Sequence, residues 1–425
     1  MSKDNKIRKS LRVSFWDGVC ASVMLGVTQD YLIPYALALK ATVKQIGLLS
    51  SLPNLCAALI QLKSADITER LASRKKIILI SVFLQAVTLL PILLIPYMAK
   101  DNHALILIIL TLLFTGFGAM SLGAWASLMS EYIPAGKRGY YFGWRNKVLG
   151  LVAVVASLCA GIILQIFKHK VLWGFLIILA VACVVRLSCV YFLALQYEPK
   201  FRHSHGHYFS FFDFLRRAKE SNFARFVFFV SSLNFCVNLA APFFAVFMIR
   251  DLHFNYLTYT MVIIPVPLTT LLLIQKWGRF ADKVGNIRIL KFCAFFIASL
   301  PLPWIVYRHP IFLIFVQIVG GFAWSGFNLC ATNFIFDSAS SPKRTRCISY
   351  FNAINGFGIS LGAIIGGYLA THLPPLAGYT LLRLFFISST MRFLVILVFT
   401  PKIKEVRSNI APVRVQGIFR YMLLK

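Results

Sequence analysis

Charged side chains are scarce in this sequence, and acidic ones are scarcer than basic ones. They make up 14% of the 425 residues, and 14 Asp and Glu stand against 44 Lys and Arg. A soluble chain of this length needs far more surface charge, whereas 59% of these residues are hydrophobic. The composition therefore excludes a soluble protein and indicates that lipid is the main solvent.

The motifs of enzymatic and metal chemistry are missing as well. The nine Cys occur singly, without a CxxC pair, so we expect neither disulfides nor a metal site. The sequence has no GxxxxGK[ST] loop and no HExxH helix, which argues against an ATP-driven pump and against a metalloprotease-type enzyme. We expect no cofactor. No Asn-X-Ser/Thr sequon occurs either, which favours a bacterial source.

Long apolar stretches dominate the chain. A helix needs about 20 mostly apolar residues to cross the hydrocarbon core of a membrane. Twelve stretches of suitable length are Ser14–Leu39, Val43–Leu62, Lys76–Met98, Ala104–Ser130, Asn146–Phe167, Val171–Gln196, Asn222–Ile249, Asn255–Gln275, Ile289–Tyr307, Pro310–Phe336, Phe351–Leu373 and Gly378–Thr400. The sequence predicts an all-α integral membrane protein with twelve transmembrane helices.

Lys and Arg concentrate in alternate loops, on the side of the amino terminus. Because cytoplasmic loops carry such an excess, we expect both termini in the cytoplasm and the protein in a bacterial inner membrane. The net charge of +30 then reflects topology and contact with anionic lipid headgroups of the bilayer. It does not call for a nucleic-acid partner.

Several features recur between the two halves in the same order. Pro34 matches Pro242, Pro134 matches Pro342, and Arg186 matches Arg392 at offsets of about 205 to 216 residues. We therefore expect two pseudo-symmetric six-helix bundles. The predicted parts are bundles at 1–196 and 222–400, a cytoplasmic central loop at 197–221 and a cytoplasmic tail at 401–425.

A loop motif follows the eighth stretch, where the chain reads Gly278-Arg-Phe-Ala-Asp282-Lys-Val-Gly285-Asn-Ile-Arg288. It resembles the loop signature of the major facilitator superfamily, in which a Gly, an Asp four residues later and a second Gly are combined with cations. The resemblance implies a cytoplasmic latch that breaks and re-forms during transport.

The corresponding loop of the first half is degenerate. It keeps Asp66, Arg70 and Arg74 but lacks both glycines. The fourth and tenth stretches end in Glu131 and Asp337, and basic residues such as Arg138 and Arg346 follow them. These acids and cations could pair in one conformation and part in another. They could equally be solvated charges that only mark the cytoplasmic side.

Asp30 is the most informative charge within a predicted span, because ionisable groups at membrane depth are costly and usually functional. It lies one turn before Pro34, and Asn238 lies at the matching point before Pro242. The resemblance implies that these two helices line a central cavity, where Asp30 would carry protons or contact a cationic group. Alternatively, it reaches external water or a structural partner. Asp17, near the start of the same helix, is expected at the interface.

Other polar residues within the spans leave two interpretations open. Arg186 could line the cavity or extend to the cytoplasmic interface. Uncharged candidates for solute contact are Gln29, Asn234, Trp324 and Asn328, although amides also join helices.

The resemblance implies a monomeric secondary transporter that moves a small organic solute by alternating access. We expect the proton, carried by Asp30, as coupling ion; a passive facilitator or an antiporter is the alternative among transporters. The alternative is a non-transporting receptor, a partner protein or a lipid-handling protein on the same fold, which the degenerate first-half loop favours.

Overall fold

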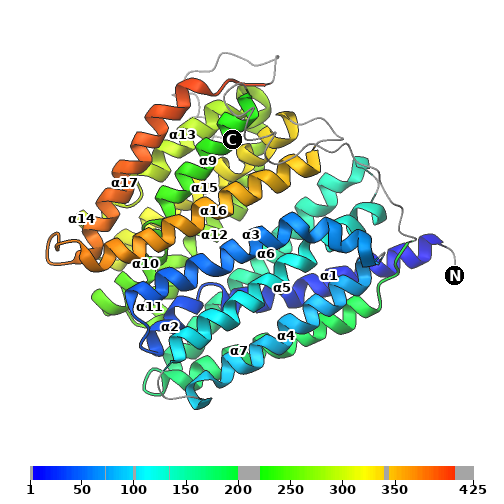
Figure 1. Ribbon diagram of the computed structural model, residues 1–425, viewed down its shortest axis with the longest axis horizontal. Helices are drawn as coiled ribbons and strands as arrows, with labels where there is room; N and C mark the ends of the chain where they lie inside the picture. The colour runs from blue at the N-terminus through cyan, green and yellow to red at the C-terminus, as the bar shows by residue number, and fades with distance from the viewer. Residues whose placement is uncertain are drawn as a thin grey trace. The chain divides into compact units, whose positions relative to one another are not determined.

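Figure 1 shows the computed structural model of the protein, which describes residues 3–71, 73–98, 102–133, 135–199, 221–338 and 344–406. Side chains are described for all of these residues except 3–4, 62–71, 130, 135–139 and 344–346. Within these ranges the chain forms helices joined by turns, and the one β-type contact is a bridge between Leu376 and Tyr379.

The helices follow the predicted order. Those of the first half are α1 (Lys3–Thr28), α2 (Leu32–Ala38), α3 (Val43–Leu71), α4 (Arg74–Met98), α5 (His103–Tyr132), α6 (Ala135–Ile166) and α7 (Val171–Ala194). Those of the second half are α9 (Asn222–Asn238), α10 (Ala241–Val246), a π-helical turn η1 (Phe247–Asp251), α11 (Tyr256–Ile263), α12 (Pro265–Val284), α13 (Asn286–Ser299), α14 (Leu302–Val306), α15 (Pro310–Ser338), α16 (Arg344–His372), α17 (Thr380–Phe399) and a 3₁₀ turn η2 (Thr400–Lys402).

Eleven helical stretches in the described residues are long and apolar enough to cross a membrane. They coincide with the eleven predicted stretches from Val43 onward, and some of them combine two or more helices. The first predicted stretch corresponds to α1 and α2, which a break separates. The predicted all-α membrane fold of twelve spans is confirmed.

Several helices continue beyond the apolar residues that revealed them. α3 runs on to Leu71, whereas the apolar stretch ends at Leu62, and α6 begins at Ala135 rather than at Asn146. Hydropathy marks only the part of a helix inside the hydrocarbon. The intrahelical hydrogen bonds continue into the polar region, where charged side chains are tolerated.

The first and seventh spans are interrupted at matching points. α1 gives way to α2 at residues 29–31, and α9 gives way to α10 at residues 239–240. A proline, Pro34 or Pro242, follows shortly after each break begins. Proline has no N–H, so the carbonyl four residues earlier loses its helical donor. Each break therefore leaves a carbonyl that needs another partner.

The described residues form two compact units. The first combines Met1–Ser204 with Ala241–Ile264 and Ala363–His372, and the second combines His205–Ala240, Pro265–Gly362 and Leu373–Lys425. In the first unit α1, α4, α5, α6 and α7 pack side by side, α10 lies against α2 and α3, and α11 lies against α6 (Figure 1). The first unit therefore includes short segments of the second half of the sequence.

The second unit has an aromatic core. α12 and α13 pack on α15, and α9 and α13 pack on α17. Phe226 of α9 and Phe334 of α15 lie 4.3 Å apart between ring centroids, and Trp277 of α12 is fully buried beside them in the same cluster. Such rings bury a large apolar area with little loss of side-chain freedom.

A glycine turn separates α12 from α13. Gly285 has a φ of 90° and a ψ of 155°, a conformation open essentially to glycine alone. Gly278, the other glycine of the signature, lies inside α12, where an added Cβ would meet the Leu329 side chain at an ordinary 3.8 Å. The backbone therefore requires glycine at Gly285 but not at Gly278.

We predict that Gly285→Ala destabilises the protein by about 1–3 kcal/mol, because a Cβ strains the backbone at this φ. The matched control is Gly278→Ala, which should be neutral or stabilising by up to about 1 kcal/mol because alanine favours a helix interior. The measurement is the apparent melting temperature of the purified protein in detergent. A lower melting temperature for Gly278→Ala than for Gly285→Ala would contradict the assignment.

Candidate functional site

Arg74, the first residue of α4, forms an ion pair with Glu131 near the end of α5. The distance from Nη1 to Oε1 is 2.6 Å, and the same nitrogen donates to the Ser127 hydroxyl at 3.3 Å. The Arg74 side chain is 3% exposed and that of Glu131 is 37% exposed. A buried guanidinium therefore depends on a carboxylate that solvent can reach.

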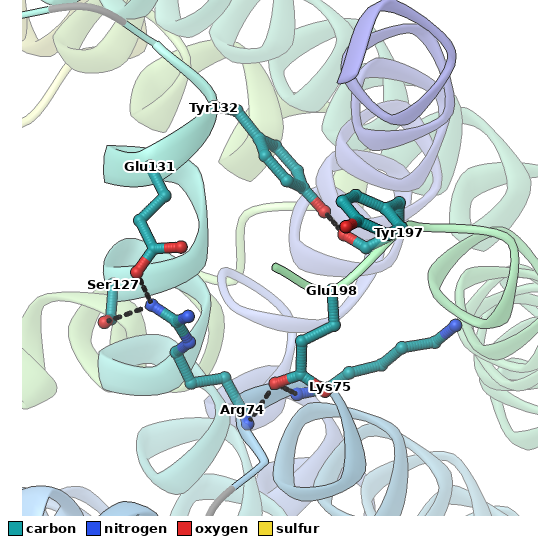
Figure 2. A network of polar contacts seen from close by, with 7 residues as sticks. All are labelled: Arg74, Lys75, Ser127, Glu131, Tyr132, Tyr197 and Glu198. Carbon is teal, nitrogen blue, oxygen red and sulfur yellow. Dashed lines mark hydrogen bonds and ion pairs between the residues drawn. The ribbon is translucent and has the colours of Figure 1, made fainter. Parts of the chain in front are cut away.

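Glu198, just after α7, caps the first turn of α4. Its Oε1 accepts hydrogen bonds from the backbone N–H groups of Arg74 at 2.6 Å and Lys75 at 3.2 Å, and its Oε2 accepts from the Ser73 hydroxyl at 2.7 Å. Figure 2 shows this carboxylate at the backbone nitrogens of Arg74 and Lys75, with the Arg74 side chain directed to Glu131. A carboxylate at this position also complements the positive end of the helix dipole.

The segment that carries Glu198 is held on both sides. The backbone N–H of Tyr197 donates to the Ser10 hydroxyl at 2.9 Å, and the Tyr132 hydroxyl donates to the Tyr197 carbonyl (Figure 2). Burial raises the pKa of Tyr132 to about 12, so this hydroxyl stays protonated as a donor. The segment thus joins α1, α4 and α5 at one end of the spans.

The second half repeats this arrangement with one change. Glu405 accepts a hydrogen bond from the backbone N–H of Ile287 at 2.8 Å, as Glu198 does from that of Lys75. Asp337, which matches Glu131, accepts from the Asn286 amide at 2.8 Å. The offsets are 405 − 198 = 207 and 337 − 131 = 206 residues. An amide therefore stands where the first half has Arg74.

The predicted latch residues occupy these ends of the helices. Asp282 and Arg288 are exposed on either side of the Gly285 turn. Four further candidates lie in α3, α6 and α16, and the structure describes their backbone but not their side chains: Asp66, Arg70, Arg138 and Arg346. Pairing between the helix-end acids and these cations stays a prediction.

A second group of polar contacts, here called the Tyr31 cluster, surrounds the break between α1 and α2. It consists of Asp30, Tyr31, Ser157, Tyr259 and Thr260. The Tyr31 hydroxyl donates to the Ser157 carbonyl at 2.6 Å and lies 2.7 Å from the Thr260 hydroxyl. The Tyr259 hydroxyl donates to the Asp30 carbonyl at 2.7 Å. The cluster therefore joins α11, from the second half of the chain, to the first span and to α6.

Asp30 keeps its side chain exposed within this cluster. One carboxylate oxygen, Oδ2, accepts a hydrogen bond from the Ser157 hydroxyl at 3.2 Å. Gln29, at the same break, is exposed as well. The two candidates of the first span thus present an acid and an amide that remain accessible at the depth where α1 is interrupted.

Glycines allow the helices around this cluster to approach closely. A Cβ on Gly161 of α6 would lie 2.1 Å from the Thr260 hydroxyl oxygen. A Cβ on Gly47 of α3 would lie 2.8 Å from the Ala363 carbonyl and 3.1 Å from the Gly367 Cα, both in α16. Neither site has room for a side chain without movement of a helix.

Arg186 lies within the helices of the first unit. It is 7% exposed and donates to the Gln85 side chain, which in turn donates to the Phe114 carbonyl at 3.1 Å. Asp17 is 6% exposed and within electrostatic range of Arg186 and Arg145. The packing of α1 against α6 and α7 buries the Asp17 side chain, so it does not face solvent, while its expected depth near the membrane interface stays a prediction.

The candidates of the second half lie on α9 and α15. The Asn234 amide donates to the Asn355 side chain at 2.7 Å, and the Asn238 amide donates to the Asn234 carbonyl at 2.8 Å. Trp324 is half-buried, with its ring 5.8 Å from that of Phe327, and Asn328 is exposed. Asn234 and Asn238 therefore lie together, and their contact with a solute stays a prediction.

Several residues of these sites were not predicted from the sequence. The two capping acids, Glu198 and Glu405, could have been found, because they follow the sixth and twelfth spans at the offset of the internal repeat. Tyr259 and Ser157 gave no such signal, since tyrosine and serine are common within apolar spans.

Comparison with known proteins gives one family. The profile described as Major Facilitator Superfamily matches residues 18–307 and 226–421. A search of characterised protein sequences finds no match.

Solved structures resemble the fold over nearly the whole chain. The nucleoside transporter NupG (D323A mutant) has a TM-score of 0.73 at 15% identity, covering 94% of this chain and 100% of that one. The D-xylose-proton symporter has a TM-score of 0.71 at 12% identity, covering 96% and 99%. A bacterial homologue of the human lysosomal transporter Spinster, inward-facing and unoccupied, has a TM-score of 0.65 at 13% identity, covering 95% and 99%. At these identities the likeness shows the fold of such transporters.

We predict that Glu131→Gln lowers stability by about 1–3 kcal/mol, because it removes the negative charge that the buried Arg74 guanidinium contacts at 2.6 Å. The control is Asp251→Asn in the more exposed Arg250–Asp251 pair, where the loss should stay below about 1 kcal/mol. Apparent melting temperatures in detergent measure both. Equal losses for the two variants would show that Arg74 does not depend on Glu131.

Proposed function

Because the chain belongs to the Major Facilitator Superfamily, we propose that it is a secondary active transporter that moves a small organic solute by alternating access, driven by protons. In this proposal residues 1–196 and 222–400 are two six-helix bundles that rock against each other in a monomer. Both termini lie in the cytoplasm, in agreement with the exposed cations Arg8, Lys9 and Arg12 at the start of α1.

The observation that carries the proposal is the contact between the two halves of the sequence within the first unit. Tyr259 and Thr260 of α11 and the glycine-lined end of α16 meet helices of the first half at the Tyr31 cluster and at Gly47. Connectivity puts these contacts at the ends of the spans away from the amino terminus. We therefore assign them to the external closure, which must part when the transporter opens outward.

Asp30 is the proposed proton carrier. Its carboxylate lies at the external closure, accepts one hydrogen bond from Ser157 and remains exposed. A carboxylate at this depth is costly when charged, so a proton or a cationic group of the solute would stabilise it. A change in its charge would act directly beside Tyr31 and Tyr259, which hold the closure.

We predict that Asp30→Asn abolishes proton-driven accumulation while leaving the fold and solute binding intact. First, the wild type is tested by thermal shift at two pH values with uridine, adenosine and D-xylose, since a ligand that binds the folded state raises its apparent stability. A compound that shifts the wild type is then tested for uptake into proteoliposomes with and without a pH gradient.

Asp251→Asn is the matched control, because it removes another acid outside the Tyr31 cluster. The Asp30→Asn protein should equilibrate the solute but not concentrate it against its gradient. Accumulation at the wild-type level by Asp30→Asn would exclude this residue as the proton carrier.

We predict that Gly161→Leu prevents external closure and lowers flux at least about tenfold. A side chain at this position collides with Thr260, and moving the two packed helices apart to make room for it is costly. The control is Gly143→Leu in the same helix, since an added Cβ at Gly143 meets no atom within 4 Å among the described residues. Thermal shift should show that Gly161→Leu still binds the solute. Wild-type flux in this variant would refute the external closure.

A further inference from the structure

The break between α1 and α2 leaves one specific carbonyl without its helical donor. In a continuous helix the N–H of residue 34 would donate to the carbonyl of residue 30. Pro34 has no N–H, so the Asp30 carbonyl cannot be satisfied within the helix. The carbonyl of the next residue, Tyr31, does have its helical partner, the N–H of Tyr35 at 2.8 Å. Among the carbonyls at the break, that of Asp30 is therefore the one whose helical donor is removed by the proline itself.

The donor that replaces it comes from the other half of the chain. The Tyr259 hydroxyl donates to the Asp30 carbonyl at 2.7 Å, and Tyr259 is 4% exposed. Its ring also lies edge-on to the ring of Tyr31, 6.2 Å away between centroids. A backbone carbonyl without a donor is costly within a membrane, so this hydrogen bond contributes more than one that only adds to a satisfied carbonyl.

We propose that Tyr259 is the residue that holds the external closure, by donating to the carbonyl that Pro34 leaves free. This inference rests on the proposed function, because it identifies the bond that must break when the external side opens. Pro34 has the role of a positioning residue, since it makes the acceptor available. The carboxylate of the same residue, Asp30, accepts a hydrogen bond from the Ser157 hydroxyl and takes no part in this contact.

Three neighbouring contacts support the closed arrangement without replacing this bond. The Tyr31 hydroxyl lies within hydrogen-bond distance of the Ser157 carbonyl and of the Thr260 hydroxyl, and the Thr260 hydroxyl lies 2.7 Å from the Tyr256 carbonyl of its own helix. The two hydroxyls have one proton each, so two of these three contacts are hydrogen bonds at any one time. These contacts align α11 on α6. The Asp30 carbonyl receives its side-chain donor from Tyr259.

The test is hydrogen exchange of the full-length protein in detergent without solute, followed by mass spectrometry of the peptides that cover α2 and α11. Exchange of these amides reports how often the contact opens. Tyr259→Phe keeps the ring and removes only the donor. Tyr256→Phe, one turn earlier on α11, is the matched control, because the structure gives its hydroxyl no hydrogen bond among the described residues.

We expect Tyr259→Phe to raise exchange in α2 and α11 by about two- to tenfold, the range set by the net strength of one hydrogen bond, and Tyr256→Phe to leave it unchanged. Pro34→Ala should raise exchange of α11 as well. The alanine N–H can donate to the Asp30 carbonyl, so breaking the hydrogen bond from Tyr259 no longer leaves that carbonyl without a donor. Combining Pro34→Ala with Tyr259→Phe should add less than the sum of the two effects.

Equal exchange in Tyr259→Phe and Tyr256→Phe would overturn the proposal. If Tyr259→Phe loosens the whole fold, including α4 and α13, Pro34→Ala decides: a rise confined to α11 supports the proposal, and no rise overturns it. These outcomes do not depend on solute. Absence of flux for every solute, with the exchange differences present, would instead count against the proposed transport function and leave the role of Tyr259 standing.

Discussion

A backbone carbonyl inside a membrane must receive a hydrogen bond, and the two interrupted spans of this protein are organised around that requirement. Wherever α-helix is continuous, the chain satisfies it locally and the side chains are free to pack. Pro34 and Pro242 each remove one helical N–H donor, at matching points of the two halves. At the first break the missing donor is a tyrosine from the other half, so a local backbone requirement becomes a contact between distant parts of the sequence.

The two halves share their end contacts but differ in charge. In the first half a buried arginine and a carboxylate meet at the start of α4, whereas in the second an amide and a carboxylate meet at the start of α13. An ion pair with one buried member is held strongly and is sensitive to the loss of either partner. At the matching point of the second half, the contact that the structure shows is a hydrogen bond from an amide to a carboxylate. The duplicated frame thus combines an ion pair in one half with an amide–carboxylate hydrogen bond in the other.

Sequence reasoning predicted the spans because each is an apolar run of membrane length. It identified Pro34 and Pro242 only as matching positions of the internal repeat and treated both spans as continuous, so the breaks were not predicted. It did not predict partners. Arg74 and Glu131 were both candidates, yet their pairing depends on how α4 lies against α5. The burial of Asp17 was not predicted for the same reason, since it depends on how α1 packs against α6 and α7. Tyr259 could not be singled out, because its proposed role depends on its contact with the Asp30 carbonyl, which the sequence does not reveal.

The contacts of Lys404 and Glu405 make the end of the last span part of the fold. Lys404 exchanges backbone hydrogen bonds with the Asn222 side chain at 2.8 and 3.0 Å, and Glu405 reaches the first turn of α13. A fluorescent reporter or affinity tag should therefore not replace or interrupt residues 404–405. A fusion point ahead of Lys404 would remove the hydrogen bonds to α9 and α13 together, and the reporter would then follow a destabilised protein.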